Sequence, residues 1–149
     1  MKYQAQLQEL RELIRASQRP EDAQARVVLT IKRHFPEFNW VGIFRLVGNN
    51  LVLGPYQGKQ PRGFEQIPVG RGICGTVAVT MRTEVVPDVN ADARYLTCFS
   101  ETRSELVVPI IKQGKFWGEI AVDASQPHAF TRDEIALIEE AAKLLAAVV

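Results

Sequence analysis

Apolar side chains recur at helical spacing at the start of the chain. The first set is spaced by four, three and four residues and consists of Tyr3, Leu7, Leu10 and Ile14. Such spacing places the side chains on one face of an amphipathic helix. A second helix is predicted over residues 20–35, because Pro20 is tolerated in a first turn whereas Pro36 ends the helix.

The middle of the chain has the patterns of β-strands. Residues 39–47 are apolar on both faces, and a turn at residues 48–50 leads to a partner strand at residues 51–53. Short strands are predicted over residues 64–67 and over residues 83–89, where Pro87 breaks the strand. The strongest hairpin is predicted over residues 104–125, with its turn at Gln113 and Gly114.

Two further helices are predicted. One begins beside Ile73. The other begins with Thr131 as its N-cap and Glu134 as the third helical residue, which together make a capping box, and it continues to the last residue. Phe130 and Ile135 form a hydrophobic staple around that box. This order of elements predicts an α+β domain whose antiparallel sheet is covered by the terminal helices.

Composition and charge exclude several classes of function. The chain has 149 residues and a net charge of +1, with no run of five or six like charges, which disfavours binding to nucleic acid. It has no apolar segment of membrane-spanning length and no signal-peptide pattern, so we expect a cytoplasmic protein that makes no membrane contact.

Three familiar site patterns are not met. The sequence GRGICG lacks the Lys and Ser or Thr, and the surrounding βαβ unit, of a phosphate-binding loop. His34 and His128 lie far apart and have no ligand spacing with cysteines or carboxylates, so no metal is expected. No serine occupies a nucleophile elbow.

The two cysteines carry the remaining chemistry. Cys74 is predicted in the first turn of a helix, where the helix dipole favours a thiolate. Cys98 is predicted in a loop or one to two helical turns, where Arg94 and Arg103 would favour an ionised sulfur if they approach it. Two reactive thiols in one pocket would support attack by one and disulfide formation by the other. Alternatively, the cysteines are small buried residues.

Several segments resemble a known family. They are NWVGIFRL, LVLGPYQGK, IPVGRGICGTVAVTMRTEVVPDVN, a cysteine followed after six residues by ELVVPI, and GEIAVD. Together they span roughly residues 38–123 and resemble the GAF-domain free methionine-(R)-sulfoxide reductases. The resemblance implies a single GAF domain over residues 1–149, with N-terminal helices in residues 1–35, sheet and pocket in residues 38–124 and a C-terminal helix in residues 131–149. It implies a six-stranded antiparallel sheet with a small-ligand pocket on the face opposite the terminal helices.

The resemblance also implies an activity and its residues. The reaction is reduction of free methionine sulfoxide with electrons from thioredoxin or another thiol, without a bound cofactor, in a homodimer. The apolar seams of the first and last helices predict that the two copies contact through these terminal helices. Cys98 matches the nucleophile and Glu105 its partner carboxylate, while Cys74 matches a second cysteine. Trp40 and Tyr56 match aromatic residues around the substrate. The remaining match, Asp123, corresponds to a strand aspartate that holds the amino group or helps protonate the leaving oxygen.

Three positions depart from the family pattern. Phe64 stands where another, commonly resolving, cysteine is usual, Phe99 follows the nucleophile in place of an aspartate, and Ala121 replaces the first strand aspartate. Two functions therefore remain open: the reductase, and a non-catalytic GAF module that binds a small ligand or a signalling partner. The absence of an attached output domain favours the enzyme.

Overall fold

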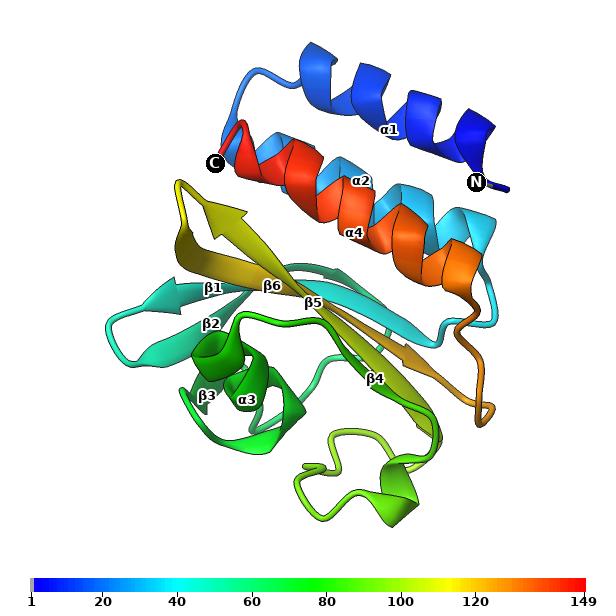
Figure 1. Cartoon of the computed structure of the whole chain (residues 1–149), viewed down its shortest axis with the longest axis vertical. Coiled ribbons are helices and arrows are strands. Elements are labelled where there is room, and N and C mark those ends of the chain that lie inside the picture. Colours follow the sequence, from blue (N-terminus) through cyan, green and yellow to red (C-terminus); the bar gives the residue numbers. More distant parts are fainter. Residues whose placement is uncertain (1) are drawn as a thin grey trace.

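The computed structural model describes residues 2–149 and contains one six-stranded antiparallel sheet with the strand order β3-β2-β1-β6-β5-β4. Figure 1 shows the strongly twisted sheet between two layers of other elements. The strands are β1 (Trp40–Val47), β2 (Asn50–Gln57), β3 (Gln66–Pro68), β4 (Glu84–Val86), β5 (Ser104–Lys112) and β6 (Lys115–Ala124). The predicted α+β class is confirmed.

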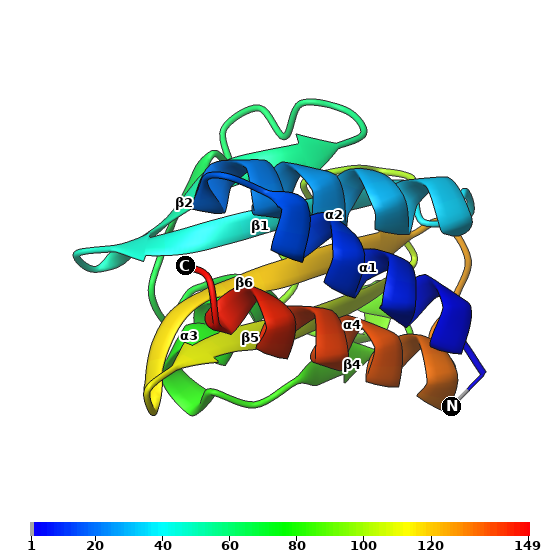
Figure 2. The ribbon, with the colours of Figure 1, turned by 90° about the horizontal axis from the view of Figure 1, so that it is seen from above.

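The helices divide between the two faces of the sheet. They are α1 (Gln4–Ala16), α2 (Pro20–His34), α3 (Gly72–Thr80) and α4 (Arg132–Ala146), with a short 3-10 turn at Val89–Ala91. α2 and α4 lie on one face of the sheet, and α1 lies across both of them as an outer layer (Figure 2). α3 and the connections around it cover the opposite face (Figure 1).

The central strands separate two clusters of buried side chains. In β6, Ile120, Val122 and Ala124 belong to the cluster under α2 and α4, whereas Ala121 belongs to the cluster under α3. Successive side chains of a strand point to opposite faces, so the residues of β1, β5 and β6 alternate between helix packing and the α3 side. Chemistry on the α3 side is therefore insulated from the larger hydrophobic core.

Several element boundaries differ from the sequence prediction: the strands expected over residues 64–67 and 83–89 are β3 at Gln66–Pro68 and β4 at Glu84–Val86. β2 extends to Gln57 instead of ending at residue 53, because a register irregularity between Gly42 and Phe44 lets the strand continue past Pro55. α4 begins after the predicted N-cap Thr131, but no side-chain cap hydrogen bond forms there, and the helix ends at Ala146.

Among residues 2–149, no helix is both long enough and apolar enough to cross a membrane. The predicted homodimer through the terminal helices stays a prediction.

Candidate functional site

The candidate site lies on the α3 side of the sheet, in a cluster of aromatic and apolar residues. Its buried members are Trp40, Phe44, Leu51, Ile67, Ile73, Cys74, Val77, Val86, Val89, Phe99, Val107 and Ala121. β1, β5 and β6 supply the floor, and α3 and the segment of residues 87–103 supply the cover (Figure 1).

Trp40 is fixed by contacts on several sides. Its indole lies over Gly42, where an added Cβ would be only 2.2 Å from the ring, and Gly58 has a similarly close approach. The indole Nε1 donates a hydrogen bond to the carbonyl oxygen of Lys59 at 3.0 Å. Tyr56 stacks on Trp40 with ring centroids 5.9 Å apart. Glycine at position 42 is thus required for an aromatic wall with one orientation.

Glu105 and Asp123 form a buried carboxyl pair. They lie directly opposite each other in the β5–β6 ladder and are 7% and 3% exposed. Thr102 donates a hydrogen bond from Oγ1 to Asp123 Oδ2 at 3.0 Å. Burial raises the pKa of Asp123, and its hydrogen bonds with Glu105 and Thr102 lower this pKa in part. Burial, followed by the adjacent charge of Asp123, raises the pKa of Glu105 well above its ordinary value. Glu105 is therefore suited to holding a proton.

Cys98 is half-buried in the loop that precedes β5. Burial raises the pKa of its thiol to about 12, and the charges of Asp123 and Glu105 act in the same direction. The condition for a thiolate stabilised by Arg94 is not met, because the Arg94 guanidinium binds Glu84 and Asp92 instead of approaching the sulfur.

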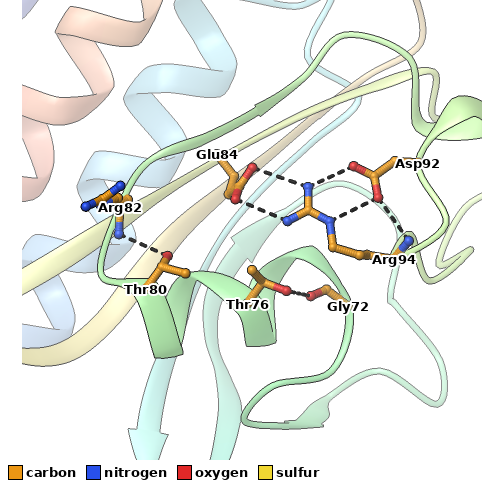
Figure 3. Close-up of polar contacts among 7 residues, drawn as sticks. All are labelled: Gly72, Thr76, Thr80, Arg82, Glu84, Asp92 and Arg94. Atoms are coloured by element: carbon orange, nitrogen blue, oxygen red, sulfur yellow. Dashed lines mark hydrogen bonds and ion pairs between the residues drawn. The ribbon is translucent and has the colours of Figure 1, made fainter.

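Arg94 fastens the loop of Cys98 to the edge of the sheet. It donates hydrogen bonds to both carboxylate oxygens of Glu84 in β4, at 3.1 and 3.3 Å, and to Asp92 at 2.8 and 3.0 Å (Figure 3). These bonds lower the pKa of Asp92. Bidentate contacts of this kind fix geometry as well as charge.

Cys74 lies in the first turn of α3, as predicted, and is buried. The prediction that the helix start favours its thiolate is wrong: burial raises the pKa of Cys74 well above the ordinary value, and the charges of Glu119, Glu105 and Asp123 raise it further. Gly72, at the start of α3, has φ +70° and lies against Leu96, where a Cβ would approach within 2.8 Å. Close packing therefore joins α3 to the loop of Cys98.

Two adjacent cavities of about 20 Å³ each bring most of these residues together. Both are lined by Cys74, Cys98, Glu105 and Ile67. One of them is also lined by Trp40, Phe44, Pro61, Phe64, Phe99, Ala121 and Asp123. The three residues that depart from the family pattern thus share a cavity wall with the matching ones. Tyr56 lines neither cavity and stacks on Trp40.

Two polar residues of this site were missed from the sequence. Tyr95 lines the other cavity, and its buried hydroxyl has no hydrogen-bond partner among the described residues. Glu119 is fully buried on β6, on the same face as Ala121 and Asp123. Strand alternation was the signal for Glu119, because residues 119, 121 and 123 share their parity.

No group of three or more histidines, cysteines or carboxylates with metal-binding geometry occurs in residues 2–149. His34 ends α2 and lies 2.8 Å from Glu9, while His128 lies in the connection before α4.

The sheet order and the helix arrangement are those of a GAF domain. The GAF domain family matches residues 5–149, so the chain belongs to this family. Over 113 residues it is 40% identical to the free methionine-R-sulfoxide reductase of Saccharomyces cerevisiae, a match that covers 73% of this chain and 62% of the yeast protein. The matched part therefore spans less than two thirds of that relative.

Solved structures give the same resemblance over nearly the whole chain. The structure of fRMsr of Staphylococcus aureus in its reduced form has a TM-score of 0.91 and 30% identity, and the match covers 97% of this chain and 93% of that one. The X-ray structure of free methionine-R-sulfoxide reductase from Neisseria meningitidis, in complex with its substrate, has a TM-score of 0.89 and 29% identity, over 95% and 84% of the two chains.

Proposed function

We propose that this protein reduces free L-methionine-(R)-sulfoxide to methionine, with Cys98 as the nucleophile. The observation that carries the proposal is the shared cavity, which brings the Cys98 thiol, the Glu105–Asp123 pair and the Trp40 indole to one place. The names of the relatives in yeast, Staphylococcus aureus and Neisseria meningitidis support the same substrate.

The first step transfers oxygen from substrate to protein. The Cys98 sulfur attacks the sulfoxide sulfur and forms a transient sulfur–sulfur bond. The sulfur–oxygen bond of the substrate and this sulfur–sulfur bond then break as the oxygen passes to Cys98, which leaves methionine and a Cys98 sulfenic acid. The substrate sulfur gains two electrons and the Cys98 sulfur loses two. Because the raised pKa keeps Cys98 protonated at neutral pH, attack is coupled to transfer of its proton to Asp123, while Glu105 protonates the departing oxygen.

The cover has to open for this substrate. A cavity of about 20 Å³ has room for roughly one water molecule, which is much less than an amino acid needs. The connection that carries Pro61 and Phe64 and the loop of Cys98 line the cavity without belonging to the sheet. On closing again, Trp40 and Phe99 exclude water and contact the apolar part of the substrate.

The second step regenerates the enzyme. Cys74 attacks the Cys98 sulfenic acid, which releases water and leaves a disulfide, and thioredoxin or another dithiol reduces that disulfide. Support comes from the two cavities that both thiols line.

A direct assay tests the proposal. Purified reduced protein is given free L-methionine-(R)-sulfoxide and dithiothreitol, with the (S) epimer and a peptide-bound sulfoxide as controls. We expect turnover of the free (R) epimer alone, and none by Cys98→Ser. Folded, reduced wild-type protein without turnover would overturn the proposal.

One observation favours the second candidate, a non-catalytic GAF module that binds a small ligand. Phe64, Phe99 and Ala121 make the cavity more apolar than cysteine and aspartates would. If the assay gives no turnover, binding of uncharged ligands by calorimetry would test this alternative.

A further inference from the structure

The Tyr95 hydroxyl is a buried polar group without a structural partner. Tyr95 lies in the connection between β4 and β5 and is partly exposed as a residue. Its hydroxyl oxygen, in contrast, is buried and has no hydrogen-bond partner among residues 2–149. The ring therefore points inward, with the hydroxyl at its buried end. A buried polar group without a hydrogen bond destabilises a fold, so the Tyr95 hydroxyl requires an explanation.

The Tyr95 hydroxyl keeps its proton. Burial raises the pKa of Tyr95, the charges of Asp123 and Glu105 raise it further, and the nearby Thr102 hydroxyl lowers it in part. Thr102 does not satisfy the Tyr95 hydroxyl, because it already donates a hydrogen bond to Asp123 at 3.0 Å and accepts one from Asn39 at 3.4 Å. Tyr95 is therefore available as a neutral hydrogen-bond donor.

Tyr95 shares a cavity with the reacting groups of the proposed function. Cys98 and Glu105, the proposed nucleophile and acid, line the same cavity as Tyr95. They also line the adjacent cavity, where the aromatic wall is Trp40. The indole N–H of Trp40 is already bonded to the carbonyl oxygen of Lys59. Tyr95 thus brings an unused donor to the place where the sulfur–oxygen bond of the substrate would break.

We propose that the Tyr95 hydroxyl donates a hydrogen bond to the sulfoxide oxygen, an inference that deepens the proposed function and rests on it. The oxygen of a sulfoxide carries partial negative charge and gains more as its bond to sulfur breaks. Glu105 gives this oxygen a proton. Tyr95 keeps its own proton and holds the oxygen as it passes to the Cys98 sulfur. A donor fixed where negative charge develops stabilises the transition state more than the bound substrate.

Methionine distinguishes this role from a structural one. It has nearly the shape of the sulfoxide but lacks the oxygen that would accept the hydrogen bond. Loss of the Tyr95 hydroxyl should therefore weaken binding of the sulfoxide and spare binding of methionine, whereas a distorted cavity would weaken both. A Cys98→Ser background permits the comparison, because a protein without the nucleophile binds the sulfoxide without consuming it.

Binding of L-methionine-(R)-sulfoxide and of L-methionine is measured by calorimetry in Cys98→Ser, with and without Tyr95→Phe. We expect Tyr95→Phe to raise the Kd of the sulfoxide about five- to tenfold and to leave that of methionine unchanged. In protein that retains Cys98, the same substitution is expected to lower kcat about 100-fold. Tyr3→Phe, at the N-cap of α1, removes a hydroxyl outside the site and is the matched control.

Removal of an unpartnered hydroxyl should not destabilise the fold, so Tyr95→Phe is expected to unfold at the same urea concentration as the wild type or a higher one. Lower stability in urea would show that the hydroxyl has a structural partner and would overturn the inference. Equal weakening of both ligands, or unchanged sulfoxide binding and kcat, would also overturn it. Wild-type protein that binds the sulfoxide without turnover would overturn the proposed function alone, and the binding comparison would then decide the role of Tyr95. Absence of sulfoxide binding would overturn both.

Discussion

Glu105 and Asp123 lie directly across from each other on neighbouring strands, with Thr102 bound to only one of them. Burial raises the pKa of both carboxyl groups, but hydrogen bonds lower that of Asp123 in part while the neighbouring Asp123 raises that of Glu105 further, so a shared proton resides on Glu105 in preference to Asp123. Two carboxyl groups of the same chemistry thus acquire different roles from their surroundings. The site can hold a proton beside the Cys98 sulfur at neutral pH.

Glu105→Gln tests the role of that proton. We expect kcat for sulfoxide reduction to fall about 10²- to 10⁴-fold, because glutamine cannot donate a proton to the departing oxygen. The raised pKa of Glu105 also predicts that wild-type activity falls at alkaline pH as this acid ionises, and the variant should lack that loss. Steady-state rates between pH 6 and pH 10 provide the measurement, and a wild-type profile in the variant would contradict the assignment.

Cys74→Ser separates the two halves of the reaction. We expect it to block turnover with thioredoxin, which needs a protein disulfide, and to spare turnover with a small dithiol that reaches the Cys98 sulfenic acid. Both reductants are compared at equal protein concentration. Full activity with thioredoxin would show that Cys74 does not resolve Cys98.

Gly42→Ala should displace the Trp40 indole. The new Cβ would lie 2.2 Å from the ring, and overpacking of this kind destabilises a fold by about 1–3 kcal/mol. We expect lower stability in urea together with a changed fluorescence of Trp40, measured in a Trp117→Phe background. Gly48→Ala is the control: it has φ +60° but no atom within 4 Å, so it should leave the Trp40 fluorescence unchanged.

Arg94→Ala should loosen the loop of Cys98. The partly exposed ion pairs with Glu84 and Asp92 contribute on the order of 1 kcal/mol, which corresponds to about fivefold faster hydrogen exchange in residues 92–102. Arg82→Ala serves as the comparison, since its only hydrogen bond in Figure 3 comes from the backbone. Equal exchange in both variants would show that Arg94 does not hold the loop.

The buried carboxyl groups predict how stability depends on pH. Glu119 has an ordinary pKa of 4.5 that burial raises in the folded state, so the folded protein binds more protons and its stability decreases as pH rises above this value. We expect the free energy of unfolding in urea to fall from pH 5 to pH 8.5, and to fall less in Glu119→Gln. Glu9 and Asp92 have lowered pKa values, so their contributions are lost only at lower pH. Equal slopes would contradict the prediction.

Local patterns predicted most of the fold. The hairpin around Gln113 and Gly114 and the helix after Thr131 occur where periodicity and turn residues placed them. β2 was predicted too short, because Gly54 and Pro55 usually end a strand and nothing local indicates the irregularity opposite them in β1. Pairing with a distant strand decided this boundary.

The sequence indicated which residues lie together at the site, but it did not indicate the direction in which the pKa values of the two thiols are shifted. Cys98, Glu105 and Trp40 converge as the family resemblance implied. The expected thiolates failed because burial outweighs a helix start at Cys74, and because Arg94 is bound by carboxylates instead of sulfur. Burial depends on the whole chain, so the sign of these pKa shifts cannot be read from neighbouring residues in sequence.

The alternation along β6 has a consequence for divergence within the fold. Residues 119, 121 and 123 point to the α3 side of the sheet, while Ile120 and Val122 pack under α2 and α4. A substitution at an odd position therefore changes the α3 side and leaves the helix-packing residues in place. This chain has Ala121 where the family pattern has an aspartate, and it carries Glu119 two positions before it. The residues that shape the α3 side and the residues that pack against the helices thus alternate along one strand, so one set can vary while the other set stays the same.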